Sequence, residues 1–187
     1  MATVSSAPLT LEEFSRLPGD GARHEMNAGE LITLPPPKSA HSRLARFVFL
    51  ALNDFVQREG ASEVYQETGY ILSHEPLTIR QPDVSVLSTA RVQATPEDSY
   101  FEGAPELAVE ILSPSDTVEA LQAKVEQYLQ TGATQVWVLS PKTQEVFVYQ
   151  SQRTLVLNSN QVLEGGDLLP GFSIRVSDLF SGSHATA

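Results

Sequence analysis

The feature that most constrains the fold is the segment 106–139, in which two short apolar runs flank a helical pattern. The runs ELAVEIL (106–112) and QVWVL (135–139) are rich in Val, Ile and Leu, as strands are. The residues between them, LQAKVEQYLQTG, predict a helix that stops at Gly132, a residue common just past helix ends. Two strands joined by one helix form a parallel pair, with the helix on one face of the sheet. The segment therefore predicts an α/β domain.

Further strands and helices are predicted on both sides of this unit. Thr10 is typical of a helix N-cap, and the helix it begins ends before Pro18. The turn formers Asn27 and Gly29 predict a hairpin over residues 23–34. The remaining expected elements are a helix over 41–55, strands at 63–72, 82–88 and 145–149, a cap at Ser115 or Asp116 for the helix before Gly132, and an edge strand with a docked aromatic residue within 168–180.

Length and composition fit one domain of the α/β (α+β) class, with a mixed central sheet flanked by helices. The chain has 187 residues, 41% of them hydrophobic, which suffices for one core. We expect this core at about 23–180 and flexible ends at 1–9 and 181–187. The lack of cysteine excludes disulfide scaffolds, zinc fingers and iron–sulfur clusters, and favours a reducing, cytoplasmic location. The sequence has neither a signal-peptide pattern nor a run of about 20 apolar residues, so no membrane contact is expected.

Two carboxylates lie in otherwise uncharged strands. Glu110 falls within the apolar run 107–112, and Asp83 follows Pro82 at the start of the strand VSVLS. An ionised carboxylate among apolar neighbours is costly unless a cation or a hydrogen-bond donor lies beside it. Each residue also has a purely structural interpretation, Asp83 as a turn residue after proline and Glu110 as half of a buried ion pair. Taken together, the pair favours a functional site.

Lys124 is the one basic residue in a strongly acidic part of the chain. Residues 95–130 contain eight acidic residues and this single lysine, which indicates either a solvated helix face or a cation held for chemistry. Two hard oxygen ligands suit Mg²⁺ or Mn²⁺ better than zinc, since the chain has no cysteine and only four histidines. Such a metal can activate water against a phosphodiester, and a lysine can neutralise charge on the phosphoryl oxygens. Tyr128 lies one turn beyond Lys124 on the same helix face.

Several motifs, in order, resemble the Uma family of restriction-endonuclease-like proteins, which belongs to the PD-(D/E)XK nuclease superfamily. They are RHEMNAGELI from Arg23, PPPKSAHSRL, PDVSV (82–86), GAPELAVEILSPSD (103–116), Lys124 with Tyr128, and GATQVWVL (132–139). The resemblance continues to LLPGFSIRVSDLF near the end and so covers nearly the whole chain. It implies a single restriction-endonuclease-like domain with a metal-dependent nuclease core.

The resemblance implies roles for three central residues. Asp83 corresponds to the motif aspartate and Glu110 to the glutamate that follows it, both as metal ligands. The superfamily pattern places a lysine two residues after the glutamate, where this chain has Leu112. In the Uma-type variant the next helix supplies the lysine, which matches Lys124. A long, flexible amine can reach the same point from a neighbouring element.

Two further residues complete the implied site. Glu25 matches the family's early glutamate and would help to hold the metal, directly or through water, although Glu30 flanks the same hairpin and competes for that role. His41 would act at the rim, with a helix-capping or core histidine as the alternative interpretation. The family usually has an acidic residue where this chain has Ala28, a departure that we expect to alter the hairpin more than the chemistry.

The sequence thus predicts an endonuclease that uses Mg²⁺ or Mn²⁺ to hydrolyse phosphodiester bonds of nucleic acid, with DNA favoured as the substrate. The net charge of -11 opposes tight non-specific binding and favours a rival from another class, a catalytically weak nuclease fold used for binding or regulation. A third interpretation, a two-carboxylate glycosidase, needs neither metal nor lysine.

Partners are less well specified by the sequence. Lys38, Arg43 and Arg46 form the one local basic cluster and could contact phosphates, although solvated helix charge is the simpler explanation. Edge strands near the C-terminus need cover, so a homodimer is expected. The residues themselves do not distinguish DNA from RNA.

Overall fold

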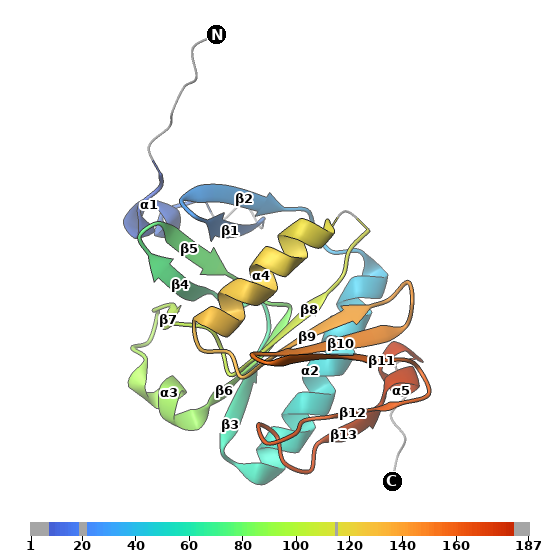
Figure 1. Ribbon diagram of the computed structural model, residues 1–187. Coiled ribbons are helices and arrows are strands. Elements are labelled where there is room, and N and C mark those ends of the chain that lie inside the picture. Colours follow the sequence, from blue (N-terminus) through green and yellow to red (C-terminus); the bar gives the residue numbers. More distant parts are fainter. Residues whose placement is uncertain (1–7, 19–21, 115, 182–187) are drawn as a thin grey trace.

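The computed structural model describes residues 8–18, 22–114 and 116–181 (Figure 1). In chain order its helices and strands are α1 (Leu11–Ser15), β1 (Arg23–Asn27), β2 (Glu30–Leu34), α2 (Ser39–Glu59), β3 (Ser62–Tyr65), β4 (Tyr70–His74), β5 (Leu77–Arg80), β6 (Val84–Ser88), α3 (Thr89–Ala94), β7 (Phe101–Glu102), β8 (Leu107–Ile111), α4 (Val118–Gln130), β9 (Gln135–Ser140), β10 (Glu145–Gln150), β11 (Arg153–Leu157), β12 (Val162–Glu164), β13 (Ser173–Arg175) and α5 (Val176–Ser181).

A six-stranded mixed sheet forms the centre of the molecule, in the order β11-β10-β9-β8-β6-β3. Strands β8 and β9 are parallel and are joined through α4, which confirms the predicted strand–helix–strand unit. The other neighbours in this sheet are antiparallel. Helices α2 and α4 lie on opposite faces (Figure 1). The predicted mixed sheet flanked by helices is therefore confirmed.

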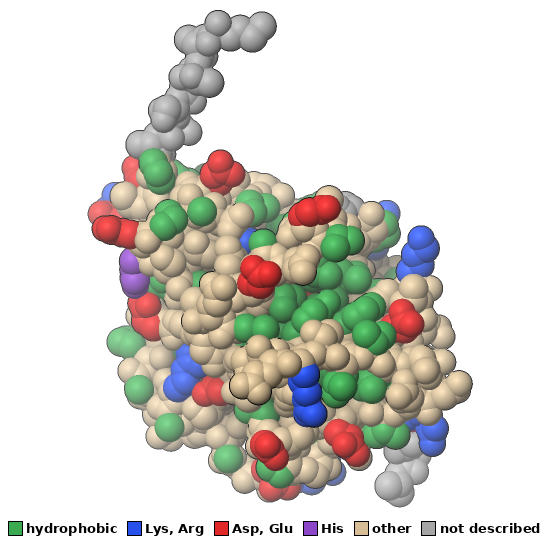
Figure 2. Space-filling model, viewed as in Figure 1, with side chains coloured by type: hydrophobic (Ala, Val, Ile, Leu, Met, Phe, Trp, Pro, Cys, Tyr) green, Lys and Arg blue, Asp and Glu red, His purple; other side chains and the backbone are tan. Residues whose placement is uncertain are grey.

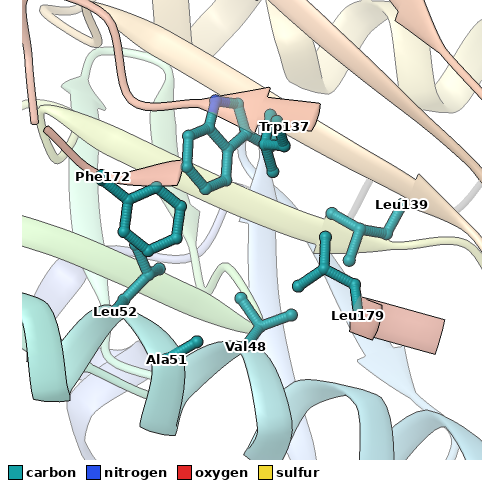
Figure 3. A pocket seen from close by; sticks show the side chains of 8 residues that line it. Val48, Ala51, Leu52, Trp137, Leu139, Phe172 and Leu179 are labelled. Carbon is teal, nitrogen blue, oxygen red and sulfur yellow. The ribbon is translucent and has the colours of Figure 1, made fainter. Parts of the chain in front are cut away.

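The alternation of side chains along β8 decides where its charge points. Leu107, Val109 and Ile111 belong to the apolar cluster under α2, whereas Ala108 belongs to the cluster under α4. Because successive side chains of a strand point to opposite faces, Glu110 lies on the α4 side. On the α2 side, apolar side chains from α2, β9 and the C-terminal region interleave, among them Val48, Leu52, Trp137, Phe172 and Leu179 (Figure 3).

A second sheet of five strands, in the order β2-β1-β5-β4-β7, lies beside the first (Figure 1). It has its own apolar cluster, centred on Phe14, Met26 and Ile79. Strand β5 of this sheet runs into β6 of the six-stranded sheet through Gln81, Pro82 and Asp83. The chain thus crosses between the two sheets at Asp83.

The prediction of one strand over 63–72 is wrong. Residues 62–65 form β3 in the six-stranded sheet, and residues 70–74 form β4 in the other. Between them Glu67 has a φ of 51°, and a Cβ on Gly69 would come within 2.5 Å of the Tyr100 ring. A left-handed residue and a close approach end the strand, and neither is visible as a break in a run of β-forming residues.

The cap of α4 is also corrected. Thr117 is the N-cap, and its hydroxyl accepts the backbone N–H of Ala120 at 3.2 Å. Asp116 instead accepts the N–H of Ser113 at 2.7 Å. The alternative cap, Ser115, lies outside the described residues.

Several other predictions are confirmed. Helix α1 begins with a capping box between Thr10 and Glu13, the hairpin forms from β1 and β2, and β10 is antiparallel to β9. Helix α2 is longer than predicted, at residues 39–59. In the tail, Phe172 packs on Trp137 at 5.8 Å between ring centroids, and β13 pairs with β12. The ends predicted to be flexible lie mostly outside the described residues.

None of the helices in the described ranges has both the length and the apolar character needed to cross a membrane.

Candidate active site

The pairing of β6 with β8 sets the two predicted carboxylates opposite each other. The antiparallel register pairs Val84 with Val109, so one further step along the ladder places Asp83 opposite Glu110. Directly opposed residues share a face of the sheet and have Cβ atoms about 5 Å apart. Both residues are buried, at 4% and 8% exposure. Asp83 therefore lies near Glu110 at the end of the β6–β8 ladder, close enough for its charge to act on Glu110.

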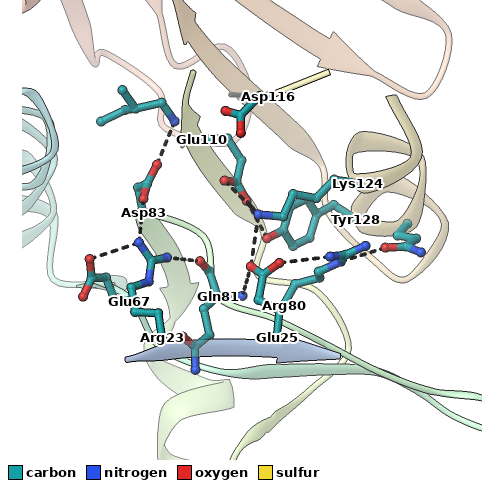
Figure 4. Close-up of polar contacts among 12 residues, drawn as sticks. Arg23, Glu25, Glu67, Arg80, Gln81, Asp83, Glu110, Asp116, Lys124 and Tyr128 are labelled. Atoms are coloured by element: carbon teal, nitrogen blue, oxygen red, sulfur yellow. Dashed lines mark hydrogen bonds and ion pairs between the residues drawn. The ribbon is translucent and has the colours of Figure 1, made fainter. Parts of the chain in front are cut away.

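Asp83 is surrounded by hydrogen-bond donors (Figure 4). Its Oδ2 accepts the backbone N–H of Ile111 at 2.8 Å and lies 3.2 Å from His41 Nε2. Its Oδ1 accepts from Arg23 Nη1 at 3.1 Å. Burial raises the pKa of Asp83, but the bonds from His41 and Ile111 and the charge of Arg23 outweigh it and leave the pKa below its usual value. Asp83 is therefore ionised at neutral pH.

Glu110 shares its oxygens between two residues of α4. Its Oε1 accepts from the Tyr128 hydroxyl at 2.8 Å, and Lys124 Nζ lies 3.1 Å from both Oε1 and Oε2. Burial raises the pKa of Glu110 to about 7; the nearby charge of Lys124 opposes this shift, while the charges of Asp83 and Glu25 add to it. Glu110 is thus poised between its two protonation states near neutral pH.

Glu25 lies on the other side of Lys124 (Figure 4). Its Oε1 is 3.0 Å from Lys124 Nζ and accepts the backbone N–H of Gln81, also at 3.0 Å, while its Oε2 accepts from Arg80 at 2.9 Å. Burial raises the pKa of Glu25, yet Lys124 and Arg80 together hold it below its usual value. Glu25 is only 1% exposed, whereas Glu30 is exposed on β2, so Glu25 is the glutamate that faces the site.

Lys124 is a buried cation that joins two carboxylates from different sheets. Burial lowers the pKa of Lys124, but the charges of Glu110 and Glu25 more than compensate and raise it above its usual value. The side chain is 16% exposed. Its isolation in an acidic stretch therefore does not reflect a solvated helix face.

His41 lies in the first turn of α2, with its side chain 18% exposed. Its hydrogen bond to Asp83 raises the pKa of the imidazole, although burial opposes the shift. Within the described residues its Nδ1 has no hydrogen-bond partner. His41 thus belongs to the site, at an accessible edge of it, and is neither a helix cap nor an enclosed core residue.

The metal-ligand roles predicted for Asp83, Glu110 and Glu25 stay predictions. Among the described residues, no three His, Asp or Glu side chains are grouped so that they could hold a metal ion by themselves. Glu25 accepts from Arg80 and from the Gln81 N–H and contacts Lys124. Asp83 and Glu110 do fit a hard cation, because they offer carboxylate oxygens and because the charge of Asp83 raises the pKa of Glu110, a repulsion that a divalent ion would relieve.

Sequence reasoning missed the residues that surround this centre. Arg23 binds Asp83 and also bonds Glu67 at 3.1 Å, and Arg80 joins Glu25 to Gln127. Arg80 ends the otherwise uncharged strand LTIR, which is the same signal that marked Glu110, so it could have been found. The predicted basic cluster at 38, 43 and 46 is exposed on α2 and its N-cap.

A mixed sheet with paired carboxylates at one end, facing a lysine of the following helix, is the architecture of a restriction-endonuclease-like protein. The comparison with known proteins identifies the family. The chain belongs to the Uma2 family, described as "Putative restriction endonuclease", whose family model matches residues 11–177. The resemblance seen in the sequence is therefore confirmed. No match is found among the curated proteins.

The chain is also similar to a solved structure, described as a "putative nuclease belonging to DUF820" from Anabaena variabilis ATCC 29413. The two chains superpose with a TM-score of 0.81 and 25% sequence identity, over 94% of this chain and 99% of the other. The similarity thus extends over the whole nuclease-like fold.

Proposed function

We propose that the protein is a metal-dependent endonuclease of the PD-(D/E)XK superfamily that hydrolyses phosphodiester bonds of DNA. The observation that carries the proposal is the contact of Lys124 Nζ with Glu110 at 3.1 Å, at the end of the β6–β8 ladder where Asp83 precedes β6. Membership of the family described as "Putative restriction endonuclease" and the similarity to the Anabaena structure described as a "putative nuclease" support the same conclusion.

In this proposal Asp83 and Glu110 hold Mg²⁺ or Mn²⁺. When bound, such an ion supplies Lewis-acid polarisation of the phosphoryl group and lowers the pKa of bound water. Asp83 and Glu110 would hold the ion beside the cations that face them, Arg23 and His41 at Asp83 and Lys124 at Glu110. Glu25 contributes by retaining Lys124 beside the metal ligands.

The chain's own residues then divide the work on the phosphate. Lys124 remains protonated, and its ammonium orients the attacking water or balances charge on the phosphoryl oxygens in the transition state. The Tyr128 hydroxyl donates to Glu110 Oε1 and so fixes the direction of that carboxylate. His41 and Arg23, which both contact Asp83, add positive charge at the edge of the site, where it would attract an anionic substrate.

The test is a cleavage assay in which Lys124→Met is compared with wild type and with Lys142→Met. Wild type should cut DNA only with Mg²⁺ or Mn²⁺. Loss of one electrostatic group aimed at a transition state typically costs about 10²-fold or more, so Lys124→Met should lose that much activity. Lys142 is exposed in the β9–β10 turn, and its substitution should leave the rate unchanged. Equal rates for both variants would remove Lys124 from the mechanism.

The same assay chooses among substrates. Double-stranded DNA, single-stranded DNA and RNA of matched length are offered with Mn²⁺, and the proposal requires that a DNA form be cut fastest. Activity on RNA alone would keep the nuclease and change its substrate. Activity that persists in EDTA would contradict the role of the metal.

A binding or regulatory module is the second candidate function, and one observation favours it. Every carboxylate of the site already has a cation within 3.2 Å, so the cluster is neutralised without metal. Such a cluster can serve as a stable core for a protein that only binds. Nucleic-acid binding without cleavage under any divalent metal would support this candidate.

Location and assembly follow from simpler properties of the chain. The lack of cysteine suits a reducing cytoplasm. Strand β11 is an edge of the six-stranded sheet, with Leu155 and Val156 exposed at 41% and 52%. An apolar edge favours pairing with a second copy, and the homodimer stays a prediction.

A further inference from the structure

Helix α4 presents three polar residues toward the site, and one of them has no role in the proposed chemistry. Lys124, Gln127 and Tyr128 are spaced so that they share one face of the helix. Lys124 and Tyr128 bind Glu110, whereas Gln127 turns to the five-stranded sheet. Its side-chain oxygen accepts from Arg80 Nε at 2.9 Å, and its side-chain nitrogen donates to Asn27 at 2.8 Å.

Arg80 connects Gln127 to the carboxylate that holds Lys124. Its Nε donates to Gln127, and its Nη1 donates to Glu25 Oε2 at 2.9 Å (Figure 4). Both members of this ion pair are buried, Arg80 at 4% and Glu25 at 1% exposure. A guanidinium is planar and rigid. The Arg80 guanidinium therefore sets both the position of Glu25 and the distance between α4 and β5, the strand that carries Arg80.

We propose that Gln127 is a positioning residue for Lys124: through Arg80 and Asn27 it fixes α4 against the five-stranded sheet, so that the ammonium lies between Glu25 and Glu110. The inference rests on the proposed function for its effect on catalysis. The positioning itself can be observed in the metal-free protein.

The length of the lysine side chain explains why it needs such support. A lysine carries its charge on a flexible four-carbon stem, and small errors in helix position change which oxygens the charge can reach. Lys124 Nζ is within 3.1 Å of three oxygens on two sheets. This geometry holds only if α4 keeps its distance from both sheets at once. Tyr128 fixes the helix to β8, and Gln127 fixes it to β1 and β5.

The kinetic test compares Gln127→Met with Gln130→Met, a glutamine exposed on the same helix. Methionine keeps the length of the side chain and removes both hydrogen bonds. Misplacing a catalytic group by about 1 Å can lower the rate about 10²-fold. A smaller displacement of Lys124 in Gln127→Met should therefore lower kcat about tenfold and leave KM nearly unchanged. Gln127→Glu keeps an acceptor for Arg80 Nε and should restore part of kcat. Gln130→Met should match wild type.

A double-mutant cycle separates positioning from a general structural effect. If Gln127 acts through Lys124, then Gln127→Met should cause no further loss of kcat in a Lys124→Met background. Additive losses of kcat would overturn the proposal, because they would mean that Gln127 affects the site by another route.

The direct readout is the NMR signal of the Lys124 ammonium in metal-free protein. An ammonium held by three oxygens exchanges slowly with water and gives a resolved ¹H–¹⁵N correlation, which Lys124→Met identifies by its loss. Gln127→Met should broaden or remove this signal, and Gln130→Met should leave it intact. An unchanged signal in Gln127→Met overturns the inference. If the signal responds but wild type cleaves no nucleic acid, the inference stands and the proposed nuclease activity fails.

Discussion

At the scale of single residues, Glu110 is the group on which the chemistry of the site depends most. Its carboxylate has the only raised acidic pKa among the three described site carboxylates, about 7, because burial and the charges of Asp83 and Glu25 raise it more than Lys124 lowers it. In the proposed metal site, a proton and a divalent ion would therefore compete for the same oxygens near neutral pH. Metal affinity should fall as the pH drops below neutral.

This raised pKa makes a testable contribution to stability. Without metal, Glu110 takes up a proton more readily when folded than when unfolded, where its usual pKa is 4.5. Its contribution to the free energy of unfolding is therefore greatest below pH 4.5 and declines as the pH rises to 7. In EDTA, the free energy of unfolding of wild type relative to that of Glu110→Gln should therefore fall by up to about 3 kcal/mol between pH 4.5 and 7. This estimate uses about 1.4 kcal/mol per pKa unit. Urea unfolding at several pH values measures the difference.

The control for this experiment is Glu126→Gln, which changes an exposed carboxylate of the same helix. Its stability should remain parallel to that of wild type from pH 4.5 to 7. Asp83 and Glu25 have lowered pKa values, so their contributions are lost toward low pH, and this loss is shared by all three proteins. A constant difference between wild type and Glu110→Gln would mean that the pKa of Glu110 is ordinary.

At the scale of elements, the β1–β2 hairpin positions Glu25 at a cost in backbone strain. Its turn contains Ala28 at a φ of 50° and Gly29 at a φ of 85°. The left-handed region suits Gly29 but costs a residue with a Cβ about 1 kcal/mol or more. The Ala28 N–H donates to Thr78 Oγ1 at 3.2 Å, and this bond helps to hold the turn in place.

Substituting Ala28 by glycine should stabilise the protein. Glycine accepts a positive φ without strain, so Ala28→Gly should raise the free energy of unfolding by about 0.5–1 kcal/mol, despite the greater freedom of glycine in the unfolded chain. Ala123→Gly, on the exposed side of α4, should instead lower it by about 1 kcal/mol. Thermal unfolding of both variants measures the effects. A loss of stability in Ala28→Gly would show that the turn is not strained.

At the scale of the whole molecule, the site lies where two sheets and two helices meet. Glu25 comes from the five-stranded sheet, Glu110 from the six-stranded sheet, His41 from α2 and Lys124 from α4. Around this nearly neutral cluster the chain carries a net charge of -11. One face of the molecule shows acidic and basic side chains interspersed around an apolar area (Figure 2). The molecule as a whole repels a phosphate backbone, and attraction must come from the site.

Affinity for DNA should therefore be weak without metal and fall steeply with salt. A net charge of -11 must be overcome locally by a divalent ion and a few Arg and His side chains. In mobility-shift experiments, Ca²⁺ should strengthen binding of a DNA duplex while preventing turnover, and raising the salt should reverse it. EDTA should release the DNA. Tight binding in EDTA would contradict this electrostatic argument and favour the binding module.

The sequence by itself determined the features that depend on neighbouring residues. The apolar runs around α4, the capping box at Thr10 and the hairpin at Gly29 follow from local periodicity and turn preferences, and all three are present. Asp83 and Glu110 could be selected as candidates from the sequence because burying a charge in an apolar strand is costly in any fold unless the charge is paired. These signals are local, so they can be read without knowing which strands pair.

Only the tertiary structure decided which partners each charge has. Arg80 is 55 residues from Glu25 and 47 from Gln127 in the sequence, and these contacts exist because β1 pairs with β5 while α4 crosses beside them. The division of 63–72 between two sheets likewise depends on a turn at Glu67 and on the ring packed against Gly69. Ion pairs and strand pairing form across distances that local patterns do not encode, because they depend on which faces the folded sheets present to each other.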